Sequence, residues 1–508
     1  MSAYTGGNRT LITFGLILSA FMNAIDATIA NIALPHIQGN ISASPEQITW
    51  VLTSYFVAQA VTIPISGWLA AQFGLKRMML VCVFGFTLAS ILCGLATSLP
   101  ELVIFRALQG MVAAPMMPIA QAVIININPP ERLGRATAIF TMAAVVAPAI
   151  GPVVGGWLTE EWSWRWCFYI NVPAGALSMV LIYMFLPAEP PKPRRFDFLG
   201  FVSLGIGISA LQLMLDRGTT LDWFSSTEIA VEAVIAGIAL WIYITHTLTA
   251  RHPLFPTALV RDRNFLTSCL FGFFFSTMTF TSFALMPLLM QGVLGYSAIH
   301  AGMLSMPRGV VMFILLQFMG RIDSLVDRRL LIAIGLAFFV VTFWQMSRFD
   351  LSMDGRAIVW ATVFQGIGQG ILFVPLSALG FLTISADLRP DAAAATSFIR
   401  NIGGSISVAV MQALTVANQQ TMHASLTVRY GRELAEAQSL PSYLSPDTTA
   451  GAVALNDELT RQALMIAYID NFRLLALIAL LCIPLVLLIR PPRKQAQDAG
   501  PIPIEMHG

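Results

Sequence analysis

Residues 78–98 read MMLVCVFGFTLASILCGLATS, a run of 21 residues that contains no charged side chain. A helix rises 1.5 Å per residue, so a run of this length spans roughly 30 Å, the thickness of a bilayer's hydrocarbon core. Only a helix satisfies every backbone polar group within one segment inside lipid. The run therefore predicts a transmembrane helix.

The same pattern recurs along the whole chain, in which 56% of the 508 residues are hydrophobic and 11% are charged. Soluble domains carry about 25% charged residues. The sequence therefore predicts an all-α transmembrane protein with 14 transmembrane helices. The predicted spans are 11–34, 47–71, 78–98, 101–125, 136–158, 166–187, 198–215, 227–249, 264–290, 299–320, 330–347, 357–383, 392–416 and 470–489.

Several classes of function are excluded by composition and motif. The net charge of +2 gives no basic footprint for nucleic acid. The five cysteines lie inside apolar runs without CxxC spacing, which predicts no metal site and no disulfide. A phosphate-binding GxxxxGK[ST] motif is also missing from the sequence, so we expect no cofactor and no enzymatic activity.

The distribution of Lys and Arg predicts the orientation of the chain. An even number of spans puts both termini on one side, and most of the 29 Lys and Arg residues fall in the connections and termini on that side. Examples are Lys76, Arg77 and Arg194. By the positive-inside rule, both termini are expected in the cytoplasm.

The chain divides into two similar halves with additions. Gln109-Gly110 has a counterpart in Gln365-Gly366, a spacing that predicts two six-helix halves. Halves of this kind are typical of alternating-access carriers, which bind substrate near the bilayer midplane. The predicted parts are an N-terminal half at 1–187, a cytoplasmic linker and two-helix insert at 188–252, a C-terminal half at 253–490 with a long outer loop at 417–468, and a cytoplasmic tail at 491–508. Within the loop, 421–438 is a candidate amphipathic helix.

Asp26 is an acid in the middle of an apolar span, about 12 Å from the outer end if the helix stops at Leu34. A charge at this depth costs roughly 2.5–3.5 kcal/mol, so such residues usually serve function. Arg106 lies at a similar depth in the fourth span. An ion pair that forms and separates could release and capture a proton. A structural hydrogen bond for Asp26, and bracing of backbone carbonyls by Arg106, are the simpler alternatives.

The segment 147–158, APAIGPVVGGWL, combines small residues with helix-breaking ones. Gly151 and Gly155 form a small-xxx-small pair that allows close approach of another helix. Pro148 and Pro152 remove backbone donors, and Gly156 adds a second glycine. We expect a helix that bends or slides against the opposite half, with ordinary tight packing as the alternative.

Several of these stretches resemble one transporter family. GWLAAQFGLKR (67–77), FRALQGMVAA (105–114) and the 147–158 segment resemble signatures of the major facilitator superfamily. NAIDATIANIALP (23–35) and WRWCFYINVPAG (164–175) resemble its fourteen-span drug–proton antiporters, and LQLMLDRGTTLDWFSSTEI (211–229) resembles the EmrB-type multidrug exporters.

The resemblance implies a major facilitator fold in which the first and fourth spans line the cavity. It implies that Asp26 and Arg106 couple proton movement, and that Gly67, Gly74, Lys76 and Arg77 belong to a conformational motif. The motif usually carries an Asp where this chain has Ala71. We therefore expect other contacts, such as Lys76 and Arg77 with helix ends, to control the outward-open state.

The candidate substrate site combines aromatic, methionine and polar side chains, which suit varied lipophilic ligands. Lipid-facing or core packing is the alternative for each of them. Arg308 and Arg400 lie deep in spans without a nearby acid and are candidates for contact with an anionic drug. The substrate-binding candidates are Asn23, Gln109, Met116, Phe280, Phe283, Arg308 and Gln365.

The predicted function is proton-coupled export of hydrophobic drugs across a bacterial inner membrane. The resemblance implies a periplasmic adaptor of the EmrA type and an outer-membrane channel of the TolC type as partners. Import of an organic acid or other metabolite, and a non-transporting membrane sensor, are the alternatives.

Overall fold

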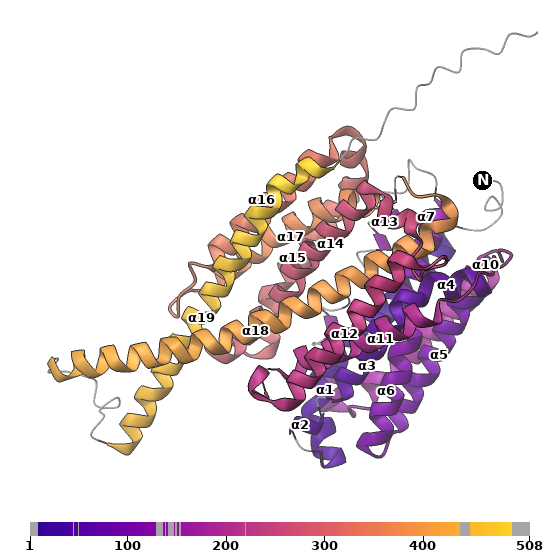
Figure 1. The fold of residues 1–508 in the computed structure, drawn as a ribbon. Coiled ribbons are helices and arrows are strands. Elements are labelled where there is room, and N and C mark those ends of the chain that lie inside the picture. The colour runs from indigo at the N-terminus through magenta and orange to yellow at the C-terminus, as the bar shows by residue number, and fades with distance from the viewer. Residues whose placement is uncertain are drawn as a thin grey trace, which may run out of the picture.

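The computed structural model describes residues 9–43, 45–48, 50–128, 136–137, 139–140, 147, 150–151, 154–218, 220–381, 383–436 and 448–489. All regular secondary structure over these residues is helical (Figure 1), which confirms the predicted all-α fold. Twelve helices in this part of the chain are long and apolar enough to cross a membrane. They coincide with twelve of the predicted spans.

The remaining two predicted spans are not among these twelve helices, for two different reasons. Span 136–158 is described only in part. Span 392–416 lies within α18 (Arg389–Glu436), whose first half carries polar residues such as Thr396 and Asn401 and packs against α14 and α19. A count of 14 is consistent with these observations.

The N-terminal half packs around α1, which runs from Arg9 to Ile41. This helix continues past Leu34, so Asp26 is about 22 Å from its far end rather than about 12 Å. Proline interrupts two other spans, at Pro64 and Pro115. The other elements are α2 (Pro45–Ile48), α3 (Trp50–Thr62), η1 (Ile63–Ile65), α4 (Ser66–Phe73), α5 (Leu75–Leu95), α6 (Leu99–Ala113), α7 (Met116–Ile127), α9 (Trp166–Tyr169) and α10 (Asn171–Phe185).

The insert is a helical pair, α11 (Phe198–Arg217) and α12 (Thr227–Thr249), joined through η2 (Trp223–Ser225). Arg217 closes the turn by an ion pair with Glu228. Thr53 of α3 donates a hydrogen bond to Asp216, which ties the insert to the N-terminal half. The insert also contacts α18 through the bond from Ser405 to Gln212, 2.6 Å.

The C-terminal half packs around buried aromatic and aliphatic side chains of its long helices, among them Phe339, Phe343 and Phe472. Its helices lie in neighbouring pairs, with α15 and α16 against α17 and α14 against α18. The other elements are α13 (Thr257–Arg261), α14 (Arg263–Leu288), η3 (Leu289–Val293), α15 (Ala298–Leu325), α16 (Arg328–Met346), α17 (Gly355–Leu379), η4 (Ala386–Leu388), α19 (Thr449–Leu485) and η6 (Val486–Leu488).

The repeat of Gln-Gly in the two halves corresponds to the same helix crossing. A Cβ atom at Gly110 of α6 would lie 2.3 Å from the carbonyl oxygen of Tyr55 in α3. A Cβ atom at Gly366 of α17 would lie 2.5 Å from the carbonyl oxygen of Arg308 in α15. Each glycine allows its helix to contact the backbone of the neighbouring helix. Tyr55 and Arg308 therefore occupy equivalent positions in the N-terminal and C-terminal halves.

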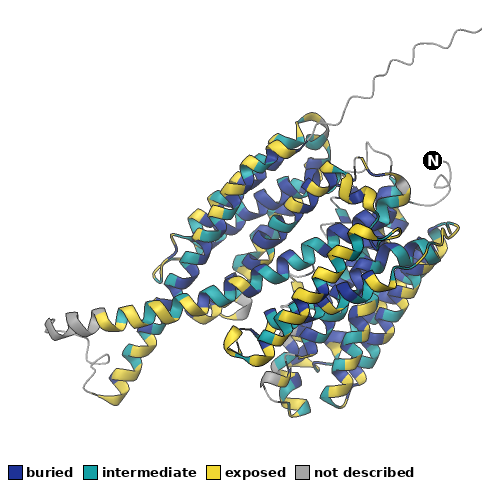
Figure 2. Cartoon of the chain, viewed as in Figure 1, coloured by how far each residue is buried: buried dark blue, intermediate teal, exposed yellow. Residues whose placement is uncertain are grey.

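The long outer connection is helical where it is described. Helix α18 continues to Glu436, and α19 already begins at Thr449, so both extend beyond the predicted spans. His423 Nε2 and Asn456 Oδ1 lie 3.1 Å apart across the two extensions. Figure 2 shows this hairpin as largely exposed or half-buried. Residues with good helix propensity, including Ala, Gln and Arg, favour helix over open loop here.

The start of α1 and the end of α19 lie at the same end of the bundle, and we call this end the terminal face (Figure 1). The N- and C-terminal halves meet there, because the first part of α18 contacts α4, η1 and α7. Arg389 donates to Asn126 across this contact, with Nη1 3.1 Å from Oδ1.

Candidate functional site

Asp26 and Arg106 form an ion pair between α1 and α6. Arg106 Nη1 lies 2.6 Å from Asp26 Oδ2, and both side chains have 0% exposure. A buried charge pair is stable only when further hydrogen bonds satisfy both groups. The surrounding residues supply most of them.

Three polar side chains from three helices complete the shell around the carboxylate. Gln109 Nε2 and Asn171 Nδ2 each donate to Asp26 Oδ1 at 3.0 Å. Both also donate to Ser90 Oγ, at 2.7 and 3.2 Å. Gln109 Oε1 accepts from Arg106 Nη1 at 2.7 Å, so Gln109 bridges the two charges. Gln109, predicted to bind substrate, is therefore occupied by the ion pair in this structure.

The guanidinium of Arg106 is held by the backbone and by aromatic rings. Its Nε donates to the carbonyl of Val51 at 3.1 Å. Its Cζ lies 4.2 Å from the ring centroid of Tyr55 and 5.7 Å from that of Phe168. The second terminal nitrogen, Nη2, is buried without a hydrogen-bond partner in the described part of the chain. Arg106 thus pairs with Asp26 and also braces a carbonyl.

Asn23 continues the polar network one turn before Asp26. Its Oδ1 accepts from the hydroxyl of Tyr55 at 3.0 Å and from Gln59 Nε2 at 3.5 Å. Its Nδ2 donates to the carbonyl of Ala113 at 3.1 Å. Tyr55 therefore contacts both Arg106 and Asn23. Through these two contacts the ion pair is connected to Gln59, which is more accessible.

The glycines of the fifth predicted span lie against α1, directly after Asp26. A Cβ atom at Gly151 would lie 2.2 Å from Thr28 Oγ1, and one at Gly155 would lie 2.8 Å from Ile29 Cγ1. These contacts are within the N-terminal half and not with the opposite half. A Cβ atom at Gly156 would have no neighbour within 4 Å in the described structure. Pro148 and Pro152 lie outside the described residues.

The C-terminal half holds a buried arginine without a carboxylate. Arg308 is 6% exposed, its Nη1 lies 3.3 Å from Gln365 Oε1, and its Cζ lies 3.8 Å from the ring centroid of Phe283. Phe280 is half exposed, whereas Met116 is fully buried in the core of the N-terminal half. Asn23 and Gln109 therefore belong to the polar network of the N-terminal half, whereas Arg308 contacts Gln365 and Phe283 in the C-terminal half.

Arg400 of α18 also has no hydrogen bond or ion pair among the described residues. Its Cζ lies 5.7 Å from the ring centroid of Phe373, and Gly272 leaves room for its stem. It borders a cavity of about 10 Å³ that also reaches Gln121 of α7, in the other half. An unpaired cation thus lies where the two halves meet.

Ion pairs join the linker after α10 to the start of α18 at the terminal face. Arg194 donates both terminal nitrogens to the carboxylate of Asp391, with Nη1 2.7 Å from Oδ2. Lys192 Nζ lies 2.5 Å from Asp387 Oδ1, and this hydrogen bond raises the pKa of the Lys192 amino group. A Cβ atom at Gly67 would lie 2.1 Å from Asp391 Oδ1. Gly67 therefore leaves the space that Asp391 occupies.

The other motif residues shape the turn between α4 and α5. Gly74 has φ +82°, a conformation that favours glycine, and ends α4. Lys76 Nζ donates to the carbonyl of Tyr183 at 2.7 Å, in the last turn of α10. The expected contact of Lys76 with a helix end is therefore present. Arg77 has no hydrogen bond or ion pair within the described ranges.

Known proteins are similar to this chain over most of its length. A profile of the Major Facilitator Superfamily matches residues 16–408. The chain belongs to the major facilitator superfamily. It is 34% identical over 495 residues to the multidrug export protein EmrB of Escherichia coli strain K12, with 96% of each chain covered. It is 38% identical over 426 residues to the EmrB protein of Haemophilus influenzae, with 83% of each covered.

Two further relatives extend the comparison. The transporter is 33% identical over 497 residues to the fatty acid resistance protein FarB of Neisseria gonorrhoeae, covering 96% of this chain and 97% of FarB. The human organic anion transporter MFSD10 has the same fold, with a TM-score of 0.57, 14% identity and coverage of 93% and 98%. Within the superfamily the chain is an EmrB-type multidrug efflux transporter, embedded in the inner membrane by many spans.

Sequence reasoning did not single out Ser90, Tyr55 or Asn171 as part of the ion-pair site. Asn171 lies in the WRWCFYINVPAG stretch, so its motif was available as a signal. Ser90 is one of many small polar residues in apolar runs and carries no signal of its own. The pair of Arg194 and Asp391 was also missed, because 197 residues separate them.

Proposed function

We propose that this transporter exports hydrophobic drugs and toxic organic compounds in exchange for protons. The observation that carries the proposal is the buried pair of Asp26 and Arg106. Desolvation favours a neutral carboxyl group, whereas a cation in contact favours a carboxylate. Separation of the pair during the transport cycle would allow Asp26 to bind a proton, and its re-formation would release that proton.

The shell around the pair supports a titrating role over a purely structural one. Arg106 Nη2 has no hydrogen-bond partner among the residues that the structure describes, and Ser90 can rotate its hydroxyl to donate or accept. Tyr55 and Asn23 provide a polar route from the pair toward Gln59. Gln59 is the member of this route with partial exposure, which suits the point where a proton enters.

The test is drug movement in inverted membrane vesicles that contain the transporter. An imposed inside-acid gradient of one pH unit should drive accumulation of a fluorescent lipophilic cation by up to about tenfold for one proton exchanged. Nigericin, which collapses the pH gradient, should abolish accumulation. Equilibration without accumulation would favour a facilitator-type carrier of metabolites, and no movement at all would favour a sensor.

We assign the terminal face to the cytoplasm, in agreement with the distribution of Lys and Arg. With this orientation the halves meet at their cytoplasmic ends. The Arg194–Asp391 pair, seated against Gly67, would then stabilise the closed cytoplasmic side. It would take the place of the contact that the family's motif Asp provides, where this chain has Ala71.

A double-mutant cycle should reveal this role. Arg194→Gln and Asp391→Asn should each shift the transporter toward an open cytoplasmic side, and the double variant should add little, with a coupling of about 0.5–3 kcal/mol. Distances between spin labels at Arg77 and Leu330, on opposite halves, would report the populations. Lys192→Gln is the control, because its pair with Asp387 is about 70% exposed and should contribute little. Additive effects of the two substitutions would contradict the proposal.

Anionic lipophiles are a second substrate class to consider, because Arg308 and Arg400 have no carboxylate partner among the described residues. The name of the relative FarB points in the same direction. Arg400→Gln should lower export of a long-chain fatty acid by about tenfold or more, since one charge-assisted contact contributes roughly 1.5–3 kcal/mol. Export of a lipophilic cation should persist. Arg348→Gln, at an exposed site, serves as the control, and equal loss for both substrates would contradict the assignment.

The helical hairpin of α18 and α19 beyond the predicted spans is our candidate for docking a periplasmic adaptor, which would connect to an outer-membrane channel. Removal of residues 424–453 shortens both helices but keeps the contact between His423 and Asn456. The variant should retain drug transport in vesicles and lose capture of the adaptor. Normal capture would transfer the docking site to the insert, whose turn at 220–226 is exposed or half-buried.

A further inference from the structure

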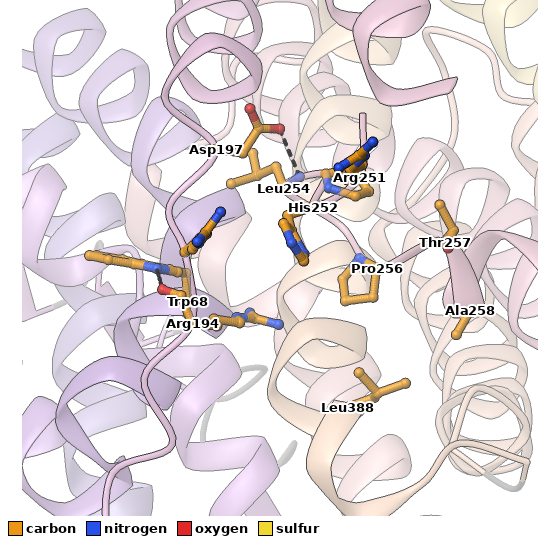
Figure 3. Close-up of a pocket in the computed structure, with 12 residues that line it drawn as sticks. Trp68, Arg194, Asp197, Arg251, His252, Leu254, Pro256, Thr257, Ala258 and Leu388 are labelled. Carbon is orange, nitrogen blue, oxygen red and sulfur yellow. Dashed lines mark hydrogen bonds between the residues drawn. The ribbon is translucent and has the colours of Figure 1, made fainter. Parts of the chain in front are cut away.

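A basic cavity of about 240 Å³ opens on the terminal face, between the linker and the connection that leads into α13 (Figure 3). Four chain segments form it: Trp68 of α4, the linker around Arg194, the connection around Arg251, and Leu388 before α18. Figure 3 shows Trp68 and Arg194 on one wall, facing His252 and Pro256 on the other. We call this space the basic cavity.

The basic side chains of the basic cavity outnumber its acids. Arg194, Arg195, Arg251 and His252 line it, together with one carboxylate, Asp197. Arg194 is neutralised by Asp391. Arg195, Arg251 and His252 have no hydrogen bond, ion pair or ring contact within the described structure. Two guanidinium groups and an imidazole are therefore available to a ligand.

Asp197, the single acid of the basic cavity, has both carboxylate oxygens in hydrogen bonds with neighbouring protein groups. Asp197 Oδ1 accepts from the backbone of Gly200 at 2.9 Å and lies 2.8 Å from His246 Nε2. Asp197 Oδ2 accepts from the backbone of Leu254 at 3.0 Å. These bonds hold the linker, the insert and the connection together, so the cavity is a built feature. The two guanidinium groups of Arg195 and Arg251 outweigh the single negative charge of Asp197.

We propose that the basic cavity binds a phosphate group and thereby stabilises the closed terminal face. Guanidinium groups match phosphate oxygens with paired hydrogen bonds, which makes phosphate the best-fitting anion. The volume is below the roughly 300–1,000 Å³ of drug-sized pockets, which argues against a second drug site. The phosphate could belong to an anionic phospholipid headgroup, since the cavity lies beside the ends of the apolar helices α11 and α12, or to a soluble phosphate.

A bound phosphate group would lie where parts that must separate on opening of the terminal face meet. Trp68, in the N-terminal half, and Leu388, directly before α18 in the C-terminal half, both line the basic cavity. A ligand that binds the basic cavity only in the closed arrangement shifts the population toward that arrangement. The inference concerns binding and does not depend on the proposed proton coupling.

The test uses the full-length protein in nanodiscs. The first arm compares phosphatidylcholine nanodiscs with and without 30% phosphatidylglycerol. The second arm adds inorganic phosphate to the protein in phosphatidylcholine nanodiscs at fixed ionic strength. Retained lipid is counted by native mass spectrometry, and the thermal midpoint is measured in both arms. Arg195→Gln/Arg251→Gln is compared with Arg261→Gln/Arg263→Gln, which removes equal charge from the same face outside the cavity. The single variant Arg251→Gln serves if the double variant is poorly expressed.

We expect phosphatidylglycerol or phosphate to raise the thermal midpoint of the wild type and of the Arg261/Arg263 variant by several degrees. The shift should fall to less than half in the Arg195/Arg251 variant. A shift with phosphatidylglycerol alone identifies a lipid headgroup, and a saturable shift with phosphate identifies a soluble ligand. Equal shifts in the two variants, or no shift in either arm, would overturn the proposal.

Discussion

Asp26→Asn is expected to abolish uphill drug export, so that cells carrying the variant accumulate drug as cells without the transporter do. The amide keeps the size of the carboxyl group and can still meet Gln109 and Asn171, but it cannot take up a proton. A one-unit pH gradient would then support no drug gradient, where the wild type supports up to about tenfold. Drug accumulation in inverted vesicles is the measurement.

The substitution leaves Arg106 as a buried charge without its partner, a change that can cost about 3–5 kcal/mol of stability. The amount of protein in the membrane must therefore be measured alongside transport, and drug binding to the purified variant should persist. Asp222→Asn is the matched control, because Asp222 is exposed and lies in the left-handed region that Asn also adopts. Uphill export by the Asp26→Asn variant would refute the assignment of the proton site.

Gly151→Leu should reduce transport by about tenfold or more while the protein still reaches the membrane. Its Cβ atom would lie 2.2 Å from Thr28 Oγ1, two residues after Asp26. The leucine pushes the fifth span away from α1 at the level of the ion pair, and such misplacement by about 1 Å can cost 100-fold in a site that needs exact geometry. Initial rates of export, normalised to protein amount, are the measurement.

Gly156→Leu provides a close control, because it makes the same chemical change five residues along the same helix. A Cβ atom there meets nothing within 4 Å in the described structure, so transport should be nearly unchanged. A similar loss of transport in both variants would indicate a general effect on the fifth predicted span. Normal transport by Gly151→Leu would show that the close approach to α1 is not required.

The transmembrane character of this chain could be predicted from local sequence alone. Apolar runs such as 78–98 must become helices in lipid, wherever they lie in the bundle. The same logic identified Asp26 and Arg106, because a charge in such a run is costly enough to mark its own importance. Boundaries were less certain, as α1 shows by continuing from Leu34 to Ile41. The polar ends of α18 and α19 give no apolar signal, so their helical continuation was expected only for 421–438.

Tertiary structure decided which residues share a site. Gln109, a candidate substrate residue, bridges Asp26 and Arg106 in this structure, because the rotation of α6 directs it toward α1 and α5. Gly151 was expected to allow close approach of another helix, and the structure shows that α1 is that helix. Arg194 and Asp391 meet only because the two halves close at the terminal face. Local sequence patterns indicate whether a segment lies in water or in lipid, because the free energy of moving a side chain from water into lipid depends mainly on that side chain. Contacts between segments depend on helix rotation and on how the halves pack, and no short stretch of this sequence encodes those.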